Sequence, residues 1–368
     1  MGDEVHRASV ARLARPVTAS SSVGPEPDDH ENEERAVSDT PAAAAGFGPV
    51  EAALLREVGG AAPSIANSQP WRFAVGTERA DVWTDPERSL PAVDPDGRQR
   101  LISCGAAVLN LRLGVAHLGF DPLVRLCPNP DDPEHVATVE RGAPGAATAV
   151  DRRLYEMVHW RHTNRADYRP QPLPGPVLRR LVAAVEKESA ALRLIDRSTE
   201  RPALAGLVVR GVEDEAHSPE VRREFVRWLS EDPEPVTGTS VGSWLGSPYP
   251  MPGLSGHDRL APGERAGMKG LVERSTLAVL HTAGDEPVDW LRAGQALQRM
   301  LLTTTADGVA VSFLNQPIEV PELRAELREL LGTGAPQLLV RLGYSRYPSH
   351  RTRRLPVRPP AEHPGRPR

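Results

Sequence analysis

The sequence lacks several residue types and segments whose presence would point to particular kinds of protein. It contains only two cysteines, Cys104 and Cys127, which are too few for a disulfide framework and cannot by themselves form a zinc site. No apolar run reaches the roughly 18 residues that a membrane-spanning helix needs. Residues 1–30 hold no apolar segment of the kind found in secretory signals. We therefore expect a soluble, cytoplasmic protein with no membrane partner.

Lysine is also scarce, because Lys187 and Lys269 are the only two and nearly all basic residues are arginines. An anionic group bound by this protein must therefore be held by arginine, whose planar guanidinium suits a phosphate. The net charge of −5 gives no strong attraction to nucleic acid or to an anionic membrane. With 39% hydrophobic and 25% charged residues, the 368-residue chain has the composition of a globular protein of one large domain or two ordinary ones.

The motifs of several enzyme classes are missing as well. The sequence has no Gly-rich P-loop, no G-x-G-x-x-G after a strand, no nucleophile elbow and no paired-cysteine motif. His159 and His162 are three residues apart, but the sequence places no further metal ligand near them. We therefore predict no metal site and no side-chain nucleophile, and neither a hydrolase nor a kinase is supported.

Two internal correspondences predict that an α+β unit is duplicated. Segment 48–58 resembles 175–185, because both begin with Gly-Pro-Val and continue with apolar residues at helical spacing. Segment 101–119 resembles 290–308, and both are typical of long buried helices that end in a glycine. Since the two correspondences occur in the same order along the chain, duplication explains them better than chance.

The duplication defines the expected domain organisation. We expect a short strand after the first helix of each copy, at 71–75 and 192–195, and a closing strand of alternating pattern at 337–344. The first half then spans 46–150 and the second half 151–357.

The second copy is longer than the first by roughly 60 residues, which fall around 213–270. They include an amphipathic stretch at 221–229 and a loop rich in Gly, Ser and Pro at 231–262. A loop of this length inside a compact domain is usually a functional cover or a disordered segment. A lid over a binding site is our sharper interpretation, and an ordinary surface excursion is the alternative. We expect 1–45 to be a disordered tail and 358–368 to be mobile.

Three polar segments are candidates for a binding site. The loop at 62–73 exposes backbone amides and polar side chains that can hydrogen-bond a flat polar ring, or that satisfy their own backbone in a plain loop. The segment at 160–165 carries two arginines with a threonine between them, which suits a phosphate or an electron-rich carbonyl, or is a solvated basic run. The segment at 349–354 is a second basic cluster, or a charged tail.

Taken together, these segments resemble the nitroreductase family of FMN-dependent oxidoreductases. The resemblance covers roughly 46–356, and it is carried by PSIANSQPWRF, RHTNRADYRPQPLP, the segment AGQALQRM…LRELLG and PQLLVRLGY. The segments DPDGRQRLISCGAAVLNLRL, HWRHTNR and SFLNQPIEVPELR resemble more closely the Acg-type actinobacterial subgroup, whose chains carry two nitroreductase-like halves. The resemblance implies an α+β nitroreductase-like fold in which the tandem duplication forms an intramolecular pseudo-dimer.

In the ordinary family, each flavin site combines the arginine motif of one subunit with the proline-serine loop of the other. Here the proline-serine loop occurs once, in the first half, and the arginine motif once, in the second. We therefore expect one complete site and one FMN per chain, with NAD(P)H as electron donor. A monomer suffices for this site, and a further homodimer is left open.

The resemblance implies roles for individual residues. Arg161 and Thr163 would contact the phosphate and ribityl chain, and Arg165 the pyrimidine edge of the ring. The C-terminal arginines would clamp the phosphate, and the proline-serine loop would pack on the ring. Asn315 and Gln316 fall near the loop that faces flavin N5, but Pro317 has no N–H to offer there. The complete expected cofactor-binding set is Pro63, Ser64, Ile65, Asn67, Gln69, Arg161, His162, Thr163, Arg165, Asn315, Gln316, Arg351, Arg353 and Arg354.

Three functions are compatible with this resemblance. In the first, NAD(P)H reduces the flavin, and a nitroaromatic, quinone or similar small acceptor then reoxidises it in the same pocket by a ping-pong mechanism. In the second, a lid covers the flavin and the protein sequesters FMN with little reductase activity. The third, dehydrogenation of a heterocycle, usually needs a Lys-Tyr pair, for which only Lys187 and Lys269 are available. The sequence leaves the acceptor and the choice of NADH or NADPH open.

Overall fold

The computed structural model describes residues 46–195, 199–230, 239–240 and 260–346. The expected tails at 1–45 and 358–368 lie outside these residues, as does most of the loop at 231–262. Arg351, Arg353 and Arg354 also lie outside them. No helix in the described part of the chain is long and apolar enough to cross a bilayer.

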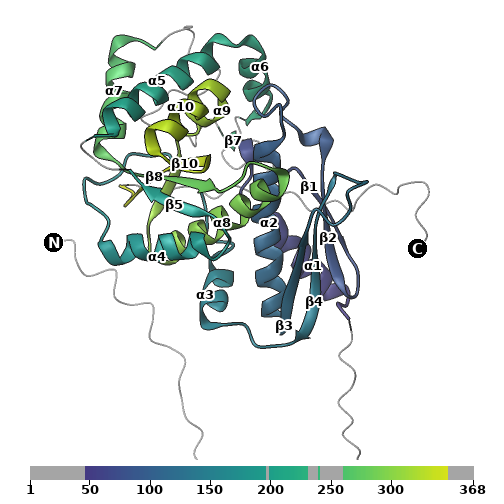
Figure 1. Cartoon of the computed structure of the whole chain (residues 1–368). Coiled ribbons are helices and arrows are strands. Elements are labelled where there is room, and N and C mark those ends of the chain that lie inside the picture. Colours follow the sequence, from purple (N-terminus) through teal and green to yellow (C-terminus); the bar gives the residue numbers. More distant parts are fainter. Residues whose placement is uncertain (1–45, 196–198, 231–238, 241–259, 347–368) are drawn as a thin grey trace, which may run out of the picture. The chain divides into compact units, whose positions relative to one another are not determined.

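The N-terminal half consists of an antiparallel sheet and two main helices, which Figure 1 shows in purple and blue. Its strands pair in the order β1-β2-β4-β3. The elements, in chain order, are α1 (Pro49–Gly60), the short turn η1 (Ile65–Asn67), β1 (Trp71–Val75), β2 (Arg79–Thr84), η2 (Pro86–Arg88), α2 (Arg98–His117), β3 (Phe120–Leu126) and β4 (His135–Pro144), and α3 (Ala149–Met157) follows.

The C-terminal half contains a second antiparallel sheet, with the order β5-β8-β10-β9. Its elements are α4 (Gly175–Glu186), β5 (Ala191–Leu194), α5 (Arg201–His217), α6 (Pro219–Arg227), the short parallel pair β6 (Leu229–Ser230) and β7 (Thr239–Ser240), α7 (Pro262–Arg274), β8 (Thr276–Thr282), α8 (Pro287–Ala306), β9 (Ala310–Phe313), α9 (Gln316–Glu319), α10 (Pro321–Leu331) and β10 (Ala335–Gly343).

The two halves share one topology. In each, a helix precedes two strands, a long helix and two more strands, and the last strand pairs between the second and the third. In the second half, α5, α6, β6, β7 and α7 are added between the first and second strands, and α9 and α10 between the third and fourth. This order supports the predicted duplication, and it places ordered helices at both ends of the segment that the sequence marks as an insertion. The mixture of helices and antiparallel sheets confirms the expected α+β class.

Strand β10 differs from the alternating pattern expected at 337–344, because every residue from Ala335 to Gly343 is buried. The strand runs between β8 and β9, and helices pack on both faces of its sheet. Leu338 and Val340 pack in a core with α4 and α8, whereas Leu339 packs in a second core with α5, α7 and α10. A strand buried on both faces loses the contrast between inward and outward residues.

The long helices α2 and α8 form the main contact between the halves, and Figure 1 shows them side by side. Each is buried along most of its length. A hydrogen bond of 2.7 Å crosses between them, from Gln298 Nε2 to Asn110 Oδ1, and both side chains are fully buried. Buried amides of this kind are satisfied only by the correct partner, so they fix how the two halves align.

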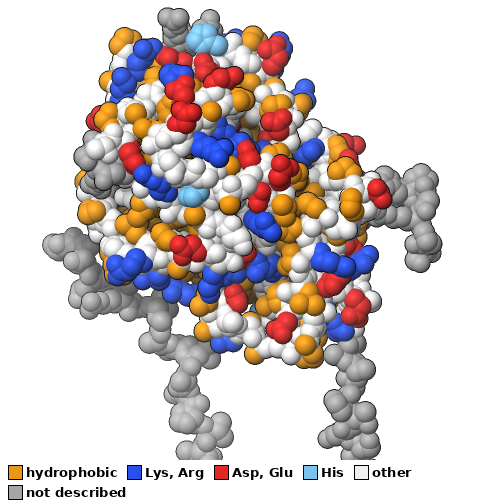
Figure 2. Space-filling view, viewed as in Figure 1, with side chains coloured by type: hydrophobic (Ala, Val, Ile, Leu, Met, Phe, Trp, Pro, Cys, Tyr) orange, Lys and Arg blue, Asp and Glu red, His pale blue; other side chains and the backbone are white. Residues whose placement is uncertain are grey.

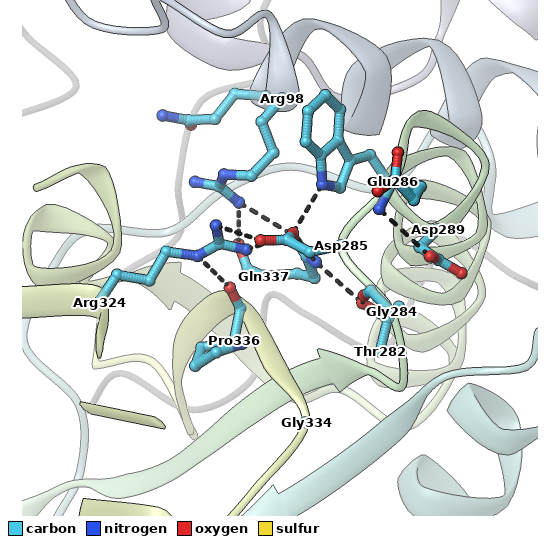
Figure 3. A network of polar contacts seen from close by, with 12 residues as sticks. Arg98, Thr282, Gly284, Asp285, Glu286, Asp289, Arg324, Gly334, Pro336 and Gln337 are labelled. Atoms are coloured by element: carbon cyan, nitrogen blue, oxygen red, sulfur yellow. Dashed lines mark hydrogen bonds and ion pairs between the residues drawn. The ribbon is translucent and has the colours of Figure 1, made fainter. Parts of the chain in front are cut away.

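A polar network joins the start of α2 to the C-terminal half (Figure 3). Arg98 donates to the carbonyl oxygen of Gln337 at 2.8 Å, and Asp285 accepts from Arg324, from the Trp290 indole and from Gln337. Burial, reinforced by the nearby Arg324, lowers the pKa of Arg98 to about 10, so its guanidinium stays charged at neutral pH. The network fixes α2 beside β10 next to the candidate site, because the neighbouring residues Gln99 and Leu338 both line it.

Candidate functional site

A pocket lies where the two halves meet, and both halves contribute to its walls. Its volume is about 180 Å³, many times the roughly 10–15 Å³ that one water needs, so it has room for an organic ring. The lining residues are Pro63, Ser64, Ile65, Ala66, Gln99, Ile102 and Ser103 from the N-terminal half, and Thr163, Arg165, Glu215, Phe225, Trp228, Leu229, Leu297, Phe313, Asn315, Gln316, Glu319 and Leu338 from the C-terminal half.

The proline-serine loop enters the pocket in a strained but well-fixed conformation. Ala66, Asn67 and Gln69 have positive φ angles of 46°, 53° and 54°, a region that non-glycine residues rarely occupy. The Gln69 N–H donates to Ser64 Oγ at 2.9 Å, and the Ile65 N–H donates to Ser103 Oγ of α2 at 3.2 Å. These bonds hold the loop against α2, so the segment 63–66 faces the pocket.

Two predicted residues of this loop lie behind it. Asn67 and Gln69 are buried and do not line the pocket. Gln69 Nε2 donates to the Asn67 carbonyl oxygen, and Arg88 donates to the Gln69 carbonyl oxygen. The Gln69 side chain therefore stabilises the conformation of the loop.

The segment at 160–165 supplies the opposite wall through Thr163 and Arg165. Asn164 anchors it, because its N–H donates to the Val311 carbonyl oxygen and its side chain donates to Ser345 Oγ at 2.8 Å. The buried Arg341 also holds the segment in place, because its guanidinium donates to the Ala166 carbonyl oxygen at 2.7 Å. The segment is thus held on the C-terminal sheet while alternate side chains face the pocket.

The other two predicted residues of this segment do not line the pocket. Arg161 is buried, and its N–H donates to the Met157 carbonyl oxygen at the end of α3. His162 Nδ1 lies 3.0 Å from the Trp160 carbonyl oxygen. The pocket therefore brings together Thr163 and Arg165 from this motif, but not their neighbours.

Asn315 and Gln316 both line the pocket where β9 leads into α9. Asn315 Oδ1 accepts from the Leu339 N–H at 3.0 Å, which ties the turn to β10. A Cβ on Gly211 of α5 would lie 2.7 Å from the backbone carbon of Gln316 and 2.9 Å from the nitrogen of Pro317. Gly211 therefore lets α5 pack closely on this turn.

Several lining residues were not predicted from the sequence: Gln99, Ile102, Ser103, Glu215, Phe225, Trp228, Leu229, Leu297, Phe313, Glu319 and Leu338. Most lie on helices that are buried over much of their surface, where the pattern of apolar residues does not show which side faces a pocket. Phe225 and Trp228 are different, because they belong to the amphipathic stretch 221–229 and its apolar side was a usable signal.

The insertion covers part of the pocket through α6 and the residues after it. Phe225, Trp228 and Leu229 contribute to the wall. The buried Glu224 fastens α6 to the N-terminal half, because its Oε2 accepts from the backbone N–H groups of Ala92 and Val93 at 3.0 and 2.8 Å. A carboxylate with two such donors makes a strong contact, and the described part of the insertion is therefore anchored to the N-terminal half.

The charge pattern of the molecule is mixed. Figure 2 shows acidic and basic side chains spread over the visible face, in agreement with the small net charge. Within the described residues, no group of three or more His, Cys, Asp or Glu side chains could hold a metal ion.

Comparison with known proteins identifies relatives along most of the chain, although no family model matches it. "Putative NAD(P)H nitroreductase Rv3131" of Mycobacterium tuberculosis is 30% identical over 295 residues, which cover 77% of this chain and 82% of that protein. The chain belongs to the nitroreductase family. Another nitroreductase relative, "Putative NAD(P)H nitroreductase acg" of the same species, is 28% identical over 292 residues, with coverage of 77% and 85%. The family resemblance predicted from the motifs is thus confirmed.

Solved nitroreductase structures give weaker matches. The crystal structure of "a putative nitroreductase" from Anabaena variabilis has a TM-score of 0.45 and 12% identity, and the match covers 78% of this chain and 82% of that one. The FMN-dependent nitroreductase NfnB from Mycobacterium smegmatis, in complex with NADPH, has a TM-score of 0.35 and 15% identity over 53% of this chain and 88% of that one. Because both TM-scores lie below 0.5, the family assignment rests on the sequence relatives.

Proposed function

We propose that this protein is an FMN-dependent NAD(P)H oxidoreductase whose flavin site is the pocket between its two halves. The observation that carries the proposal is the meeting of two motifs there. The loop 63–66 comes from the N-terminal half, whereas Thr163 and Arg165 come from the C-terminal half. The names of the relatives, which describe NAD(P)H nitroreductases, support the same activity.

The residues present fit a flavin. Pro63, Ile65, Leu297, Phe313 and Leu338 give the pocket apolar surfaces, as the faces of a flat ring require. The hydroxyl and guanidinium of Thr163 and Arg165, together with the amides of Asn315 and Gln316, supply polar groups for its edge. An apolar space with a few convergent donors is the usual form of a cofactor site.

The cofactor and the protein contribute different parts of the reaction. FMN, when bound, supplies hydride transfer from NAD(P)H and on to a nitroaromatic, quinone or similar small acceptor, which use the same pocket in turn. The protein's own residues bind and orient. The apolar walls exclude water, and the positive charge of Arg165 stabilises negative charge that develops nearby. Of the predicted basic residues, Arg165 is the one that lines the described pocket.

A second candidate function is sequestration of FMN. The observation that favours it is the position of the insertion, since Phe225, Trp228 and Leu229 line the pocket and Glu224 fastens α6 to the N-terminal half. A cover held in this way would slow the entry of NAD(P)H and of an acceptor.

One experiment separates the two functions. The protein is loaded with FMN, and its visible spectrum is recorded anaerobically before and after addition of NADPH, then of NADH. Bleaching within seconds by either nucleotide is expected for the oxidoreductase. A spectrum that persists with both nucleotides but bleaches with dithionite would support sequestration instead. Failure to bind FMN at all would contradict both.

A further inference from the structure

Two carboxyl groups meet in the wall of the pocket, and the proposed flavin site assigns neither a role. Glu215 comes from α5 and Glu319 from α9, and both line the pocket. The Glu215 carboxyl faces Glu319 and the side chain of Gln316. Glu319 is held from the other half, because Gln99 Nε2 of α2 donates to its Oε1 at 2.9 Å. The pair therefore lies between residues of both halves.

The environment of the pair disfavours a double negative charge. Burial, and then the neighbouring Glu319 carboxyl, raise the pKa of Glu215 well above its ordinary value. Arg98 of α2 is near enough to Glu319 for their charges to interact, but it donates to Gln337. Arg265 of α7 instead pairs with Glu213, on the same helix as Glu215. Among the described residues no cation pairs with Glu215, so its carboxyl holds a proton to higher pH than an ordinary glutamate does.

Two oxygen atoms of this wall are buried without a hydrogen-bond partner in the described part of the structure. They are Oε1 of Glu215 and Oε1 of Gln316. Buried acceptors are normally satisfied, and each exception calls for an explanation. The proposed flavin site already uses the Gln316 amide, so Glu215 Oε1 is the acceptor left for a second ligand that donates a hydrogen bond to this wall of the pocket.

The remaining wall shows what kind of molecule would carry those donors. Phe225, Trp228 and Phe313 line the same pocket with aromatic rings. Aromatic faces pack well on flat compounds and attract cations. Arg165 contributes a positive charge to the pocket, and the proposed function assigns it to the flavin. The acidic wall is then left for the second ligand.

We propose that the Glu215–Glu319 pair makes the pocket selective for flat acceptors that carry an amine or another cationic nitrogen. This inference rests on the proposed function, since it names the acceptor class of the same site. A cationic nitrogen provides the missing donor and compensates the negative charge, so Glu215 gives up its proton when such a compound binds. A neutral compound of the same shape leaves the proton in place and gains less.

The test compares two probes of nearly equal size, 4-nitrobenzylamine and 4-nitrobenzyl alcohol. Their affinities for the FMN-loaded protein are measured by calorimetry without any reductant, so the readout does not depend on turnover. We expect the amine to bind about tenfold more tightly, as one hydrogen bond to a charged group typically contributes. Its binding is expected to release protons, seen as a heat that changes with the ionisation enthalpy of the buffer. Equal affinity for both probes would overturn the proposal.

Substitutions test whether the preference for the amine comes from the Glu215–Glu319 pair. Glu215→Gln and Glu319→Gln each keep the size of the side chain and mimic its neutral form, so both are expected to fold and to bind the two probes equally. Glu220→Gln, at an exposed position of α6, is the matched control and keeps the preference. A preference that survives in Glu215→Gln would also overturn the proposal. The titrations are repeated without FMN, so that loss of flavin binding, which contradicts the proposed function, is distinguished from loss of the amine preference.

Discussion

Gly105 and Gly294 touch where α2 crosses α8. A Cβ on Gly294 would lie 2.0 Å from the carbonyl oxygen of Ile102 and 2.8 Å from the Cα of Gly105, and one on Gly105 would lie 2.1 Å from the carbonyl oxygen of Leu291. Only glycine lets the two backbones approach this closely. The two residues are also counterparts in the internal correspondence of the sequence, so the same contact is made from both halves.

Gly294→Ala is therefore expected to force the helices apart and to lower the free energy of unfolding by about 3 kcal/mol, the upper end of ordinary overpacking. Gly206→Ala in α5 is the control, because no heavy atom lies within 4 Å of its Cβ position. That change should be neutral or stabilise by up to about 1 kcal/mol. Urea unfolding measures both, and equal effects of the two substitutions would contradict the contact.

The contact that holds α6 on the N-terminal half can be tested at Glu224. Glu224→Gln keeps an acceptor oxygen but removes the charge that two backbone N–H groups share, at an expected cost of about 1–2 kcal/mol to this contact. Hydrogen exchange at the Ala92 amide, which donates to Glu224 Oε2, should become faster, as should exchange along α6. Glu220→Gln on the same helix should leave both unchanged. Hydrogen-exchange protection that is unchanged in Glu224→Gln would show that other contacts hold α6 in place.

The network around Asp285 predicts a dependence of stability on pH. Burial alone would raise the pKa of Asp285, but hydrogen bonds from Arg324, Trp290 and Gln337 outweigh it and hold the pKa below 3.8. A carboxyl with a lowered pKa stabilises the fold above its unfolded pKa of about 3.9, and this contribution is lost as pH falls through the folded value.

Asp285→Asn should therefore destabilise the protein by a constant amount between about pH 5 and 8, and the difference from wild type should shrink only below about pH 4. Urea unfolding at a series of pH values measures this, with the exposed Glu329→Gln on α10 as the control. A difference that instead grows toward low pH would contradict the assignment.

Much of the fold could be predicted because local patterns decide it. The buried helices α2 and α8 and the paired starts of α1 and α4 follow from apolar spacing, Pro at the first turn and Gly at the end. Strand β2 was missed because two of its buried residues, Asp81 and Thr84, are polar. Asp81 is satisfied by His135 and Thr138 from β4, far along the chain. Local pattern does not reveal such partners.

The residues of the candidate site also fall into those that a local motif predicts and those that it does not. The loop 63–66 and the pair Thr163 and Arg165 were predicted because each motif is contiguous. Gln99, Glu215 and Glu319 were not, because they come together only when three helices from distant parts of the chain pack. Tertiary structure therefore adds the acidic wall, which the sequence does not indicate.

The internal duplication leaves a second position, at 188–191, that corresponds to the proline-serine loop of the first copy. Where the second copy has Glu188 instead of a proline-serine loop, that carboxylate is buried and bonds Arg112 and Arg299. The second copy therefore has a buried ion group at the position where the first copy has its polar loop.

A titration of flavin-free protein with FMN, followed by flavin fluorescence, tests the shared site directly in the wild type and in Arg165→Ala. The wild type is expected to bind one FMN per chain. Removing Arg165 should raise the Kd about tenfold or more, because a charge-assisted hydrogen bond is lost. Arg328→Ala, an exposed position on α10, should bind as the wild type does. Two flavins per chain, or an unchanged Kd in Arg165→Ala, would contradict a single site shared between the halves.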